Sequence, residues 1–236
     1  MKRLLALALF ASAAMAADTE RSLAEWIIRY GGGVTLEGSP EEIRELWALP
    51  EGGVSVVAAD LTGTLITPED LPRLAQLRGL RELYLPGPMW NEGAGSRRDS
   101  NKDLGALNAL ASLEKLYFSI HFLTDINIQD KGIEQLAALT NLRELRLQQT
   151  KVKGRTLSVF PSLTALDLTY SRFDDEGMAS LAHMKNLRRL LVKDTLVSDA
   201  GLHHITGLTK LEELDLYGCR VTDAGLAQLS GLTAMK

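Results

Sequence analysis

Apolar residues recur along most of the chain in a pattern whose period changes within each unit. Between residues 211 and 216 the leucines end in alternation, which is typical of a short strand with one buried face. Between residues 226 and 232 leucine recurs at every third position, which is typical of a helix or a 3₁₀-like turn. Thr222 and Asp223, in the linking sequence, are candidate N-caps for that helix. Each unit is therefore predicted to be a strand, a corner and a helix.

The template L-x-x-L-x-L marks the strand of each unit. Its copies begin at Val56, Leu80, Leu113, Leu142, Leu163, Leu187 and Leu211, so the spacings are 24, 33, 29, 21, 24 and 24 residues. The departures from 24 fall in the connectors, such as the Gly- and Ser-rich stretch at 91–100. No unit of this size buries both rows of leucines alone, so the units must stack. Because strands pack closer together than helices, the stack must curve with its sheet on the inside.

The corner after the strand is repeated almost unchanged. It reads "TLVSDAGL" at Thr195–Leu202 and "CRVTDAGL" at Cys219–Leu226, with looser copies at Ser171–Met178 and Thr64–Leu71. These units resemble leucine-rich repeats, in particular the ~24-residue bacterial, ribonuclease-inhibitor-like kind with the corner T-x-V-T-D-A-G-L. The resemblance covers residues 54–236. It implies an α/β solenoid of about seven repeats, with a curved parallel β-sheet on the concave face and helices on the convex face.

Residues 17–53 are predicted to form a helical N-terminal cap. Leu23, Trp26, Ile27 and Tyr30 share one helical stripe, which ends at Gly31. Terminal repeats need a cover for their exposed leucines, so we expect this region to be a lid on the first repeat. The alternative is a separate functional domain.

A second cap helix is predicted to begin at Ser39 after a short strand in "VTLEG". Ser39 would be the N-cap, Pro40 the first helical residue, and Glu42 would close a capping box. On this pattern the residues expected to face inward are Ile43, Leu46 and Trp47.

The last unit has no comparable cover in the sequence. Met235 stands where the next unit's first leucine would fall. We therefore expect an unpaired edge at the strand around 214–216 and an uncovered flank along 226–232. Three explanations stay open: a truncated reading frame, a frayed last turn that tolerates exposure, or an edge used for self-association into a homo-oligomer.

The first residues predict export. "MKRLLALALFASAAMA" has the basic start, apolar run and small residues of a signal peptide over residues 1–16, and it is short for a membrane span. The alternative is an uncleaved amino-terminal anchor. Cleavage would leave no membrane span and would place the protein in the periplasm, on the cell surface or outside the cell. It removes two basic residues and no acidic ones, so the formal charge goes from −4 to −6.

Composition and motifs argue against several functional classes. A mildly acidic chain without a basic run lacks the electrostatic pattern of a nucleic-acid or anionic-lipid binder. Cys219 is the single cysteine, so neither an internal disulfide nor a Cys pair for zinc is available. His183, His203 and His204 lack an H-E-x-x-H context, and Asp174–Glu176 lacks the spaced ligands of a calcium loop. We therefore predict no enzyme activity, metal site or cofactor.

Candidate binding residues lie between the template leucines, because those side chains point away from the core. Tyr84 and Tyr117 are expected to stand side by side with Arg146 next to them, and tyrosine and arginine are enriched in binding hot spots. The same rings and cation also stabilise a sheet without any ligand, so a purely structural role is the alternative. The predicted binding residues of the concave face are Tyr84, Lys115, Tyr117, Glu144, Arg146, Asp167, Arg189, Asp215 and Tyr217.

At the third position of the template, acidic and basic residues alternate from one unit to the next, beginning with Glu82. Neighbouring strands can satisfy such charges among themselves. The sequence thus predicts an exported recognition module that holds a protein or a glycan on its concave sheet. The alternative is a structural element that assembles through its open carboxyl-terminal repeat.

Overall fold

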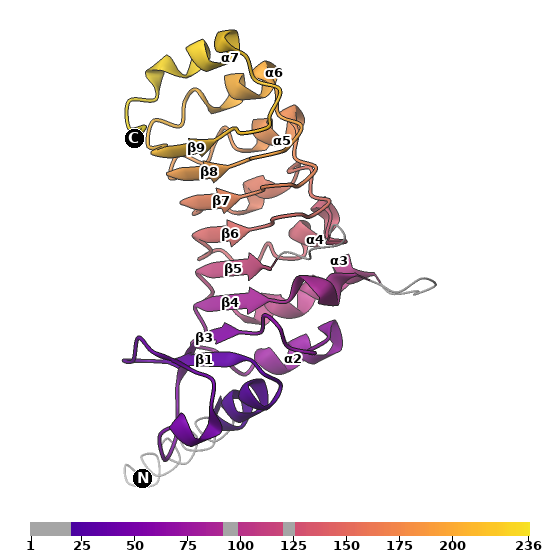
Figure 1. Cartoon of the computed structure of the whole chain (residues 1–236), viewed down its shortest axis with the longest axis vertical. Coiled ribbons are helices and arrows are strands. Elements are labelled where there is room, and N and C mark those ends of the chain that lie inside the picture. The colour runs from indigo at the N-terminus through magenta and orange to yellow at the C-terminus, as the bar shows by residue number, and fades with distance from the viewer. Residues whose placement is uncertain (1–19, 92–98, 120–125) are drawn as a thin grey trace, which may run out of the picture.

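A computed structural model describes residues 20–91, 99–119 and 126–236. The predicted signal peptide over residues 1–16, and most of the stretch at 91–100, lie outside these residues. The described chain forms a nine-stranded sheet with the order β2-β1-β3-β4-β5-β6-β7-β8-β9 (Figure 1). Within those residues, no helix has the length and apolar character needed to cross a membrane.

The strands after the cap region run parallel, each paired with the next one along the chain. They are β3 (Val56–Asp60), β4 (Glu82–Leu85), β5 (Lys115–Phe118), β6 (Glu144–Arg146), β7 (Ala165–Asp167), β8 (Arg189–Leu191) and β9 (Glu213–Asp215).

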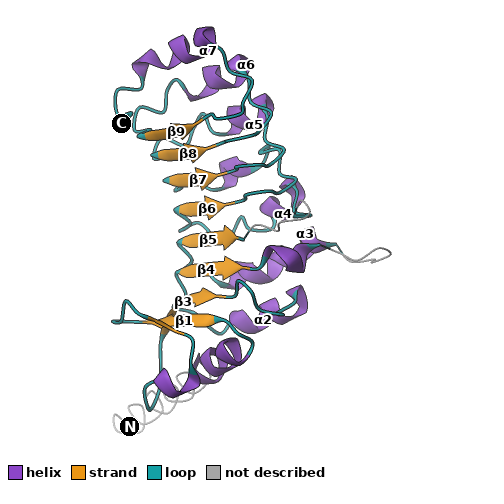
Figure 2. Ribbon diagram, in the orientation of Figure 1, coloured by secondary structure: helices purple, strands orange, loops and turns teal. Residues whose placement is uncertain are grey.

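Each connection returns through short helical segments on the opposite side of the stack (Figure 2). The α-helices are α2 (Leu71–Leu74), α3 (Ser100–Asp103), α4 (Asp130–Glu134), α5 (Asp175–Ser180), α6 (Asp199–Leu202) and α7 (Asp223–Ala227). The 3₁₀ segments are Leu46–Ala48, Pro68–Asp70, Gly87–Trp90, Leu104–Ala109, Leu157–Val159, His203–Ile205 and Gln228–Gly231. The predicted layering, with strands on one side and helices on the other, is confirmed.

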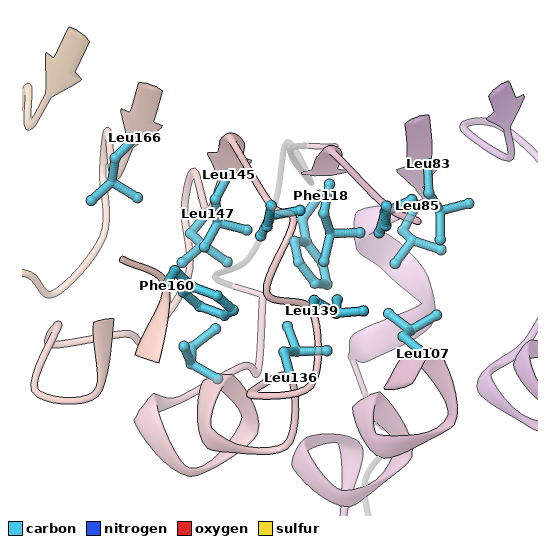
Figure 3. Close-up of a cluster of buried hydrophobic side chains, with 14 of the residues drawn as sticks. Leu83, Leu85, Leu107, Phe118, Leu136, Leu139, Leu145, Leu147, Phe160 and Leu166 are labelled. Carbon is cyan, nitrogen blue, oxygen red and sulfur yellow. The ribbon is translucent and has the colours of Figure 1, made fainter. Parts of the chain in front are cut away.

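The template leucines form one continuous spine. Parallel pairing aligns Leu83, Leu116, Leu145, Leu166, Leu190 and Leu214. Figure 3 shows strand leucines facing the leucines of the helical side, with Phe118 and Phe160 between the two rows. Each fully buried leucine contributes about 1.5–3 kcal/mol, which one unit obtains only when neighbours cover both its sides. The alignment predicted from the spacing is confirmed.

The repeated Asp-Ala-Gly corner has a structural cause. The Asp175 carboxylate accepts hydrogen bonds from the Ser198 N–H at 2.7 Å and the Ser198 hydroxyl at 2.6 Å, one unit further along. A Cβ at Gly201 would lie 2.5 Å from Asp175 Oδ1, so glycine is needed for this approach. The same arrangement joins Asp199 to Thr222 at 2.8 and 2.6 Å. These two carboxylates therefore fix the starts of α6 and α7, each in the unit after their own.

The helical stripe predicted for the N-terminal region is confirmed except at its last residue. Leu23, Trp26 and Ile27 are buried on the helix over residues 20–29, as predicted, but Tyr30 is 49% exposed. The strand β1 (Gly33–Leu36) runs antiparallel to both β3 and β2 (Glu42–Ile43).

The helix predicted from Ser39 is wrong, because residues 42–43 extend along β1 instead. Arg44 holds this strand by bonding Glu42 at 2.9 Å and by pairing with Asp60. The nonlocal contacts, which are the pairing with β1 and the ion pair with Asp60, override the local capping signal. The residues expected to face inward are instead partly or largely exposed: Ile43 is half-buried, Leu46 is 37% exposed and Trp47 is 84% exposed.

At the other end of the sheet order, β9 pairs with β8, and Leu226 is 50% exposed. Leu214 and Leu216 are only partly buried there. Self-association through this edge stays a prediction.

Candidate functional site

The parallel register arranges the sheet's outward side chains in two columns. The first column runs through Ala58, Glu82, Lys115, Glu144, Ala165, Arg189 and Glu213. The second column runs through Asp60, Tyr84, Tyr117, Arg146, Asp167, Leu191 and Asp215. The predicted residues Lys115, Glu144 and Arg189 lie in the first column, and Tyr84, Tyr117, Arg146, Asp167 and Asp215 in the second; Tyr217 follows β9.

Two tyrosines and an arginine are stacked in the second column. The ring centroids of Tyr84 and Tyr117 are 4.8 Å apart at an interplanar angle of 43°. The Arg146 Cζ lies 4.8 Å from the centroid of the Tyr117 ring. Stacking restricts all three side chains before any ligand arrives, which lowers the entropy cost of binding.

The tyrosine hydroxyls donate to carboxylates of the first column. Tyr84 donates to Glu82 Oε2 at 3.2 Å, and Tyr117 donates to Glu144 Oε2 at 2.5 Å. Burial, together with these carboxylates, raises the pKa of both phenols. Both tyrosines are therefore neutral donors at physiological pH, and their protons are directed into the sheet's own acids.

Charges in the first column pair across neighbouring strands, as their alternation predicts. Lys115 Nζ lies 2.9 Å from Glu82 Oε1, and this hydrogen bond raises the pKa of Lys115. Arg189 Nε lies 3.0 Å from Glu213 Oε2. These two pairs satisfy both basic residues of the first column.

Arg146 is bonded less completely than its neighbours. The carboxylate facing it, Asp167, already accepts from Gln148 Nε2 at 2.6 Å and from the Thr169 N–H at 3.0 Å. Arg146 Nε is 3.6 Å from Asp167 Oδ2, beyond hydrogen-bond distance. Among the described residues this buried Nε has no hydrogen-bond partner, while 42% of the Arg146 side chain is exposed.

A hollow opens beside Arg146, because alanine occupies the neighbouring first-column position on β7. It is lined by Tyr117, Glu144, Arg146, Ala165, Asp167, Arg189 and Leu191, together with Leu145 and Leu166 of the buried spine. The hollow thus lies at the centre of the predicted residues, and it brings Arg146 and Arg189 to opposite sides of one small side chain.

The sequence analysis missed one exposed aromatic residue. Tyr170 has a left-handed φ of 60° and is 53% exposed. Lys193 Nζ lies 5.7 Å from its ring centroid and 4.8 Å from that of Tyr217, which is 70% exposed. The sequence signal for a left-handed residue at this position lies in the last unit, where the equivalent residue is Gly218, and glycine adopts this conformation readily.

Metal chemistry finds no structural support within residues 20–91, 99–119 and 126–236. Those residues contain no group of three or more His, Cys, Asp or Glu side chains arranged to hold a metal ion. Cys219 is a free cysteine whose thiol donates to the Val192 carbonyl at 3.1 Å.

Comparisons with known proteins agree with this architecture. The family model described as Leucine Rich repeat matches residues 161–182 and 207–230. No curated protein sequence matches the chain.

Several solved structures are similar to the chain. Internalin C2 from Listeria monocytogenes is 25% identical with a TM-score of 0.59, and the match covers 76% of this chain and 68% of that one. TLR13, solved as a complex with ssRNA13, is 22% identical with a TM-score of 0.54, covering 77% of this chain and 25% of that one. InlP from Listeria monocytogenes is 12% identical with a TM-score of 0.51, covering 71% and 45%. The chain therefore has the leucine-rich-repeat fold, with structural neighbours among bacterial proteins.

Proposed function

We propose that the protein is an exported recognition module that holds a protein partner on the concave face of its sheet. The observation that carries the proposal is the stacked group of Tyr84, Tyr117 and Arg146. Tyrosine and arginine are the residue types most enriched in binding hot spots, and here they are held in place by one another. The predicted secretory leader over residues 1–16 supports export.

A nucleic-acid ligand fits this face less well than a protein does. TLR13 was solved with single-stranded RNA, but a likeness at 22% identity concerns the fold alone. The two columns of this chain hold six carboxylates and three cations, and the whole chain has a formal charge of −4. A nucleic-acid backbone carries a phosphate at every nucleotide and needs an excess of Lys and Arg along its whole path, which this face lacks.

A triple substitution tests the proposal. Changing Tyr84, Tyr117 and Arg146 to Ser should abolish capture of partner protein from the surface fraction of the exporting cell. The aromatic pair and the cation–π contact contribute about 2 kcal/mol together, so the melting temperature should fall by only about 4–8 °C.

A control triple variant removes exposed residues elsewhere: Tyr30, Leu65 and Arg78, each changed to Ser. It should retain capture at the level of the unmodified chain. Capture that survives the concave-face variant, or that is lost equally in both variants, would show that this face is not the binding surface.

A further inference from the structure

Building on the proposed function, we infer that the partner segment is acidic and that Arg146 and Lys193 bind its carboxylates. These residues lie on the same face, on β6 and just after β8. They differ from the other cations of the face in one respect, which is how far the chain itself already satisfies them.

Of five cations on or beside this face in the described part of the chain, three are hydrogen-bonded to carboxylates, whereas Arg146 has only a 3.6 Å ionic contact with Asp167. Lys115 bonds Glu82, Arg189 bonds Glu213, and Arg44 bonds Glu42 and Asp60; these cations have little remaining demand for a ligand. In the part of the chain that the structure describes, Arg146 and Lys193 have no hydrogen-bonded carboxylate.

Arg146 keeps its donors because the acidic side chains beside it, Asp167 and Glu144, accept hydrogen bonds from other residues. Both oxygens of Asp167 accept from Gln148 and Thr169, which leaves the 3.6 Å contact to Arg146 Nε. The Tyr117 ring then fixes the guanidinium plane. A fixed, half-exposed guanidinium with unused N–H groups suits a carboxylate, which it can bind through two parallel hydrogen bonds.

Lys193 is held in a similar way. Its ammonium lies 4.8 Å from the Tyr217 ring centroid and 5.7 Å from that of Tyr170. Such contacts position a cation without using its hydrogen-bond donors on an acceptor. Arg146 and Lys193 therefore both rest on tyrosine rings, and neither uses its donors in a hydrogen bond to a carboxylate.

The acceptors of the face are already engaged, which favours a carboxylate over a sugar. The partners within the chain are Thr62 and Arg44 for Asp60, Tyr84 and Lys115 for Glu82, Tyr117 for Glu144, Gln148 and Thr169 for Asp167, Arg189 for Glu213 and the Tyr217 N–H for Asp215. A glycan offers hydroxyls that need both donors and acceptors, whereas a carboxylate needs donors alone.

The spacing of the two cations suits an extended protein segment. Two strand spacings and two residues along the strand place the backbones of Arg146 and Lys193 about 12 Å apart. Acidic residues about four positions apart span this distance in an extended chain and project from the same side of it. The hollow above Ala165 lies between β6 and β8 and is too small to hold a side chain, so the intervening residues would pass across its mouth.

Peptide binding to the full chain tests the inference. The probes are short fluorescent peptides with two glutamates about four positions apart, the same peptides with glutamine in place of glutamate, and polygalacturonate as an acidic glycan. We expect the glutamate peptides to bind at least about ten-fold more tightly than the glutamine peptides.

The matched variants separate donor availability from net charge. Arg146→Gln and Lys193→Gln should each weaken glutamate-peptide binding by about ten-fold, whereas Arg44→Gln, with the same charge change at a cation already paired with Glu42 and Asp60, should weaken it by less than about two-fold. Circular dichroism and melting temperature check that each variant is folded.

Three results would overturn the inference: equal losses in all three variants, tighter binding of polygalacturonate than of any glutamate peptide, or no binding of glutamate peptides. If the triple variant of Tyr84, Tyr117 and Arg146 still loses capture of the natural partner in these cases, the proposed function stands without an acidic ligand. If capture also survives that triple variant, both proposals fail.

Discussion

Adding one methyl group at Gly201 should destabilise the solenoid by displacing a carboxylate of the preceding unit. In an isolated helix, Gly→Ala stabilises by up to about 1 kcal/mol. Here the new Cβ would lie 2.5 Å from Asp175 Oδ1, which no carbon and oxygen pair tolerates without movement. If Asp175 shifts, it loses both hydrogen bonds from Ser198.

The balance of these effects sets the sign of the change. Two partly buried hydrogen bonds to a carboxylate contribute about 2–4 kcal/mol together. Subtracting the gain in helix propensity leaves a net cost of about 1–3 kcal/mol for Gly201→Ala. Urea unfolding with linear extrapolation measures this free energy, provided that the slope is unchanged.

A double-mutant cycle isolates the clash. In an Asp175→Ala background the nearest remaining atoms to the added Cβ are Met178 Cγ at 3.1 Å and Asp175 Cα at 3.3 Å, and the methionine side chain can move. Gly201→Ala should then be neutral or stabilising by up to about 1 kcal/mol. Equal costs in both backgrounds, within about 0.5 kcal/mol, would refute the reasoning.

Gly105→Ala is the matched control for this cycle. Its added Cβ would meet only Gln135 Oε1 at 3.7 Å, an ordinary van der Waals distance. It should leave the free energy of unfolding nearly unchanged. A cost like that of Gly201→Ala would mean that loss of glycine, rather than the Asp175 contact, explains the result.

Two further predictions concern pH and processing. Burial alone would raise the pKa of Asp174, but hydrogen bonds from Arg155 and the Gly177 N–H hold that pKa below its usual value. The stabilisation is therefore present above about pH 4 and is lost as the pH falls through the folded pKa. The difference in unfolding free energy between the unmodified chain and Asp174→Asn should shrink below about pH 4, and a constant difference would contradict this. N-terminal sequencing of the exported chain should begin at residue 17, and a chain that retains Met1 would contradict cleavage.

The spine of the fold could be predicted from sequence because it depends on spacing alone. Leucines that recur at the template positions must align once units stack in register, and Leu145 and Leu166 do so. The adjacency of Tyr84, Tyr117 and Arg146 follows from the same register. Because the units repeat regularly, contacts between neighbouring units can be predicted from the sequence of each unit.

The helix predicted from Ser39 is wrong because a nonlocal contact there interrupts the repeat. Glu42 carries a capping signal for a helix, but its backbone pairs with Thr35, and this contact has no counterpart in the other units. Similarly, Arg146 and Arg189 look equivalent as sequence letters. They differ in hydrogen bonding because the Gln148 amide donates to Asp167 in place of Arg146, and this contact is not predictable from the sequence pattern.

The charge pairs between neighbouring strands also limit which repeats can be lost during evolution. Recombination between copies that excised the unit of β5 would remove Lys115 and bring Glu82 beside Glu144, so two carboxylates would face each other. Excision of the unit of β7 would bring Glu144 beside Arg189 and Arg146 beside Leu191, and neither pair has like charges. Shortening of such an array should therefore be tolerated at some junctions and selected against at others, even though every unit shares the same hydrophobic template.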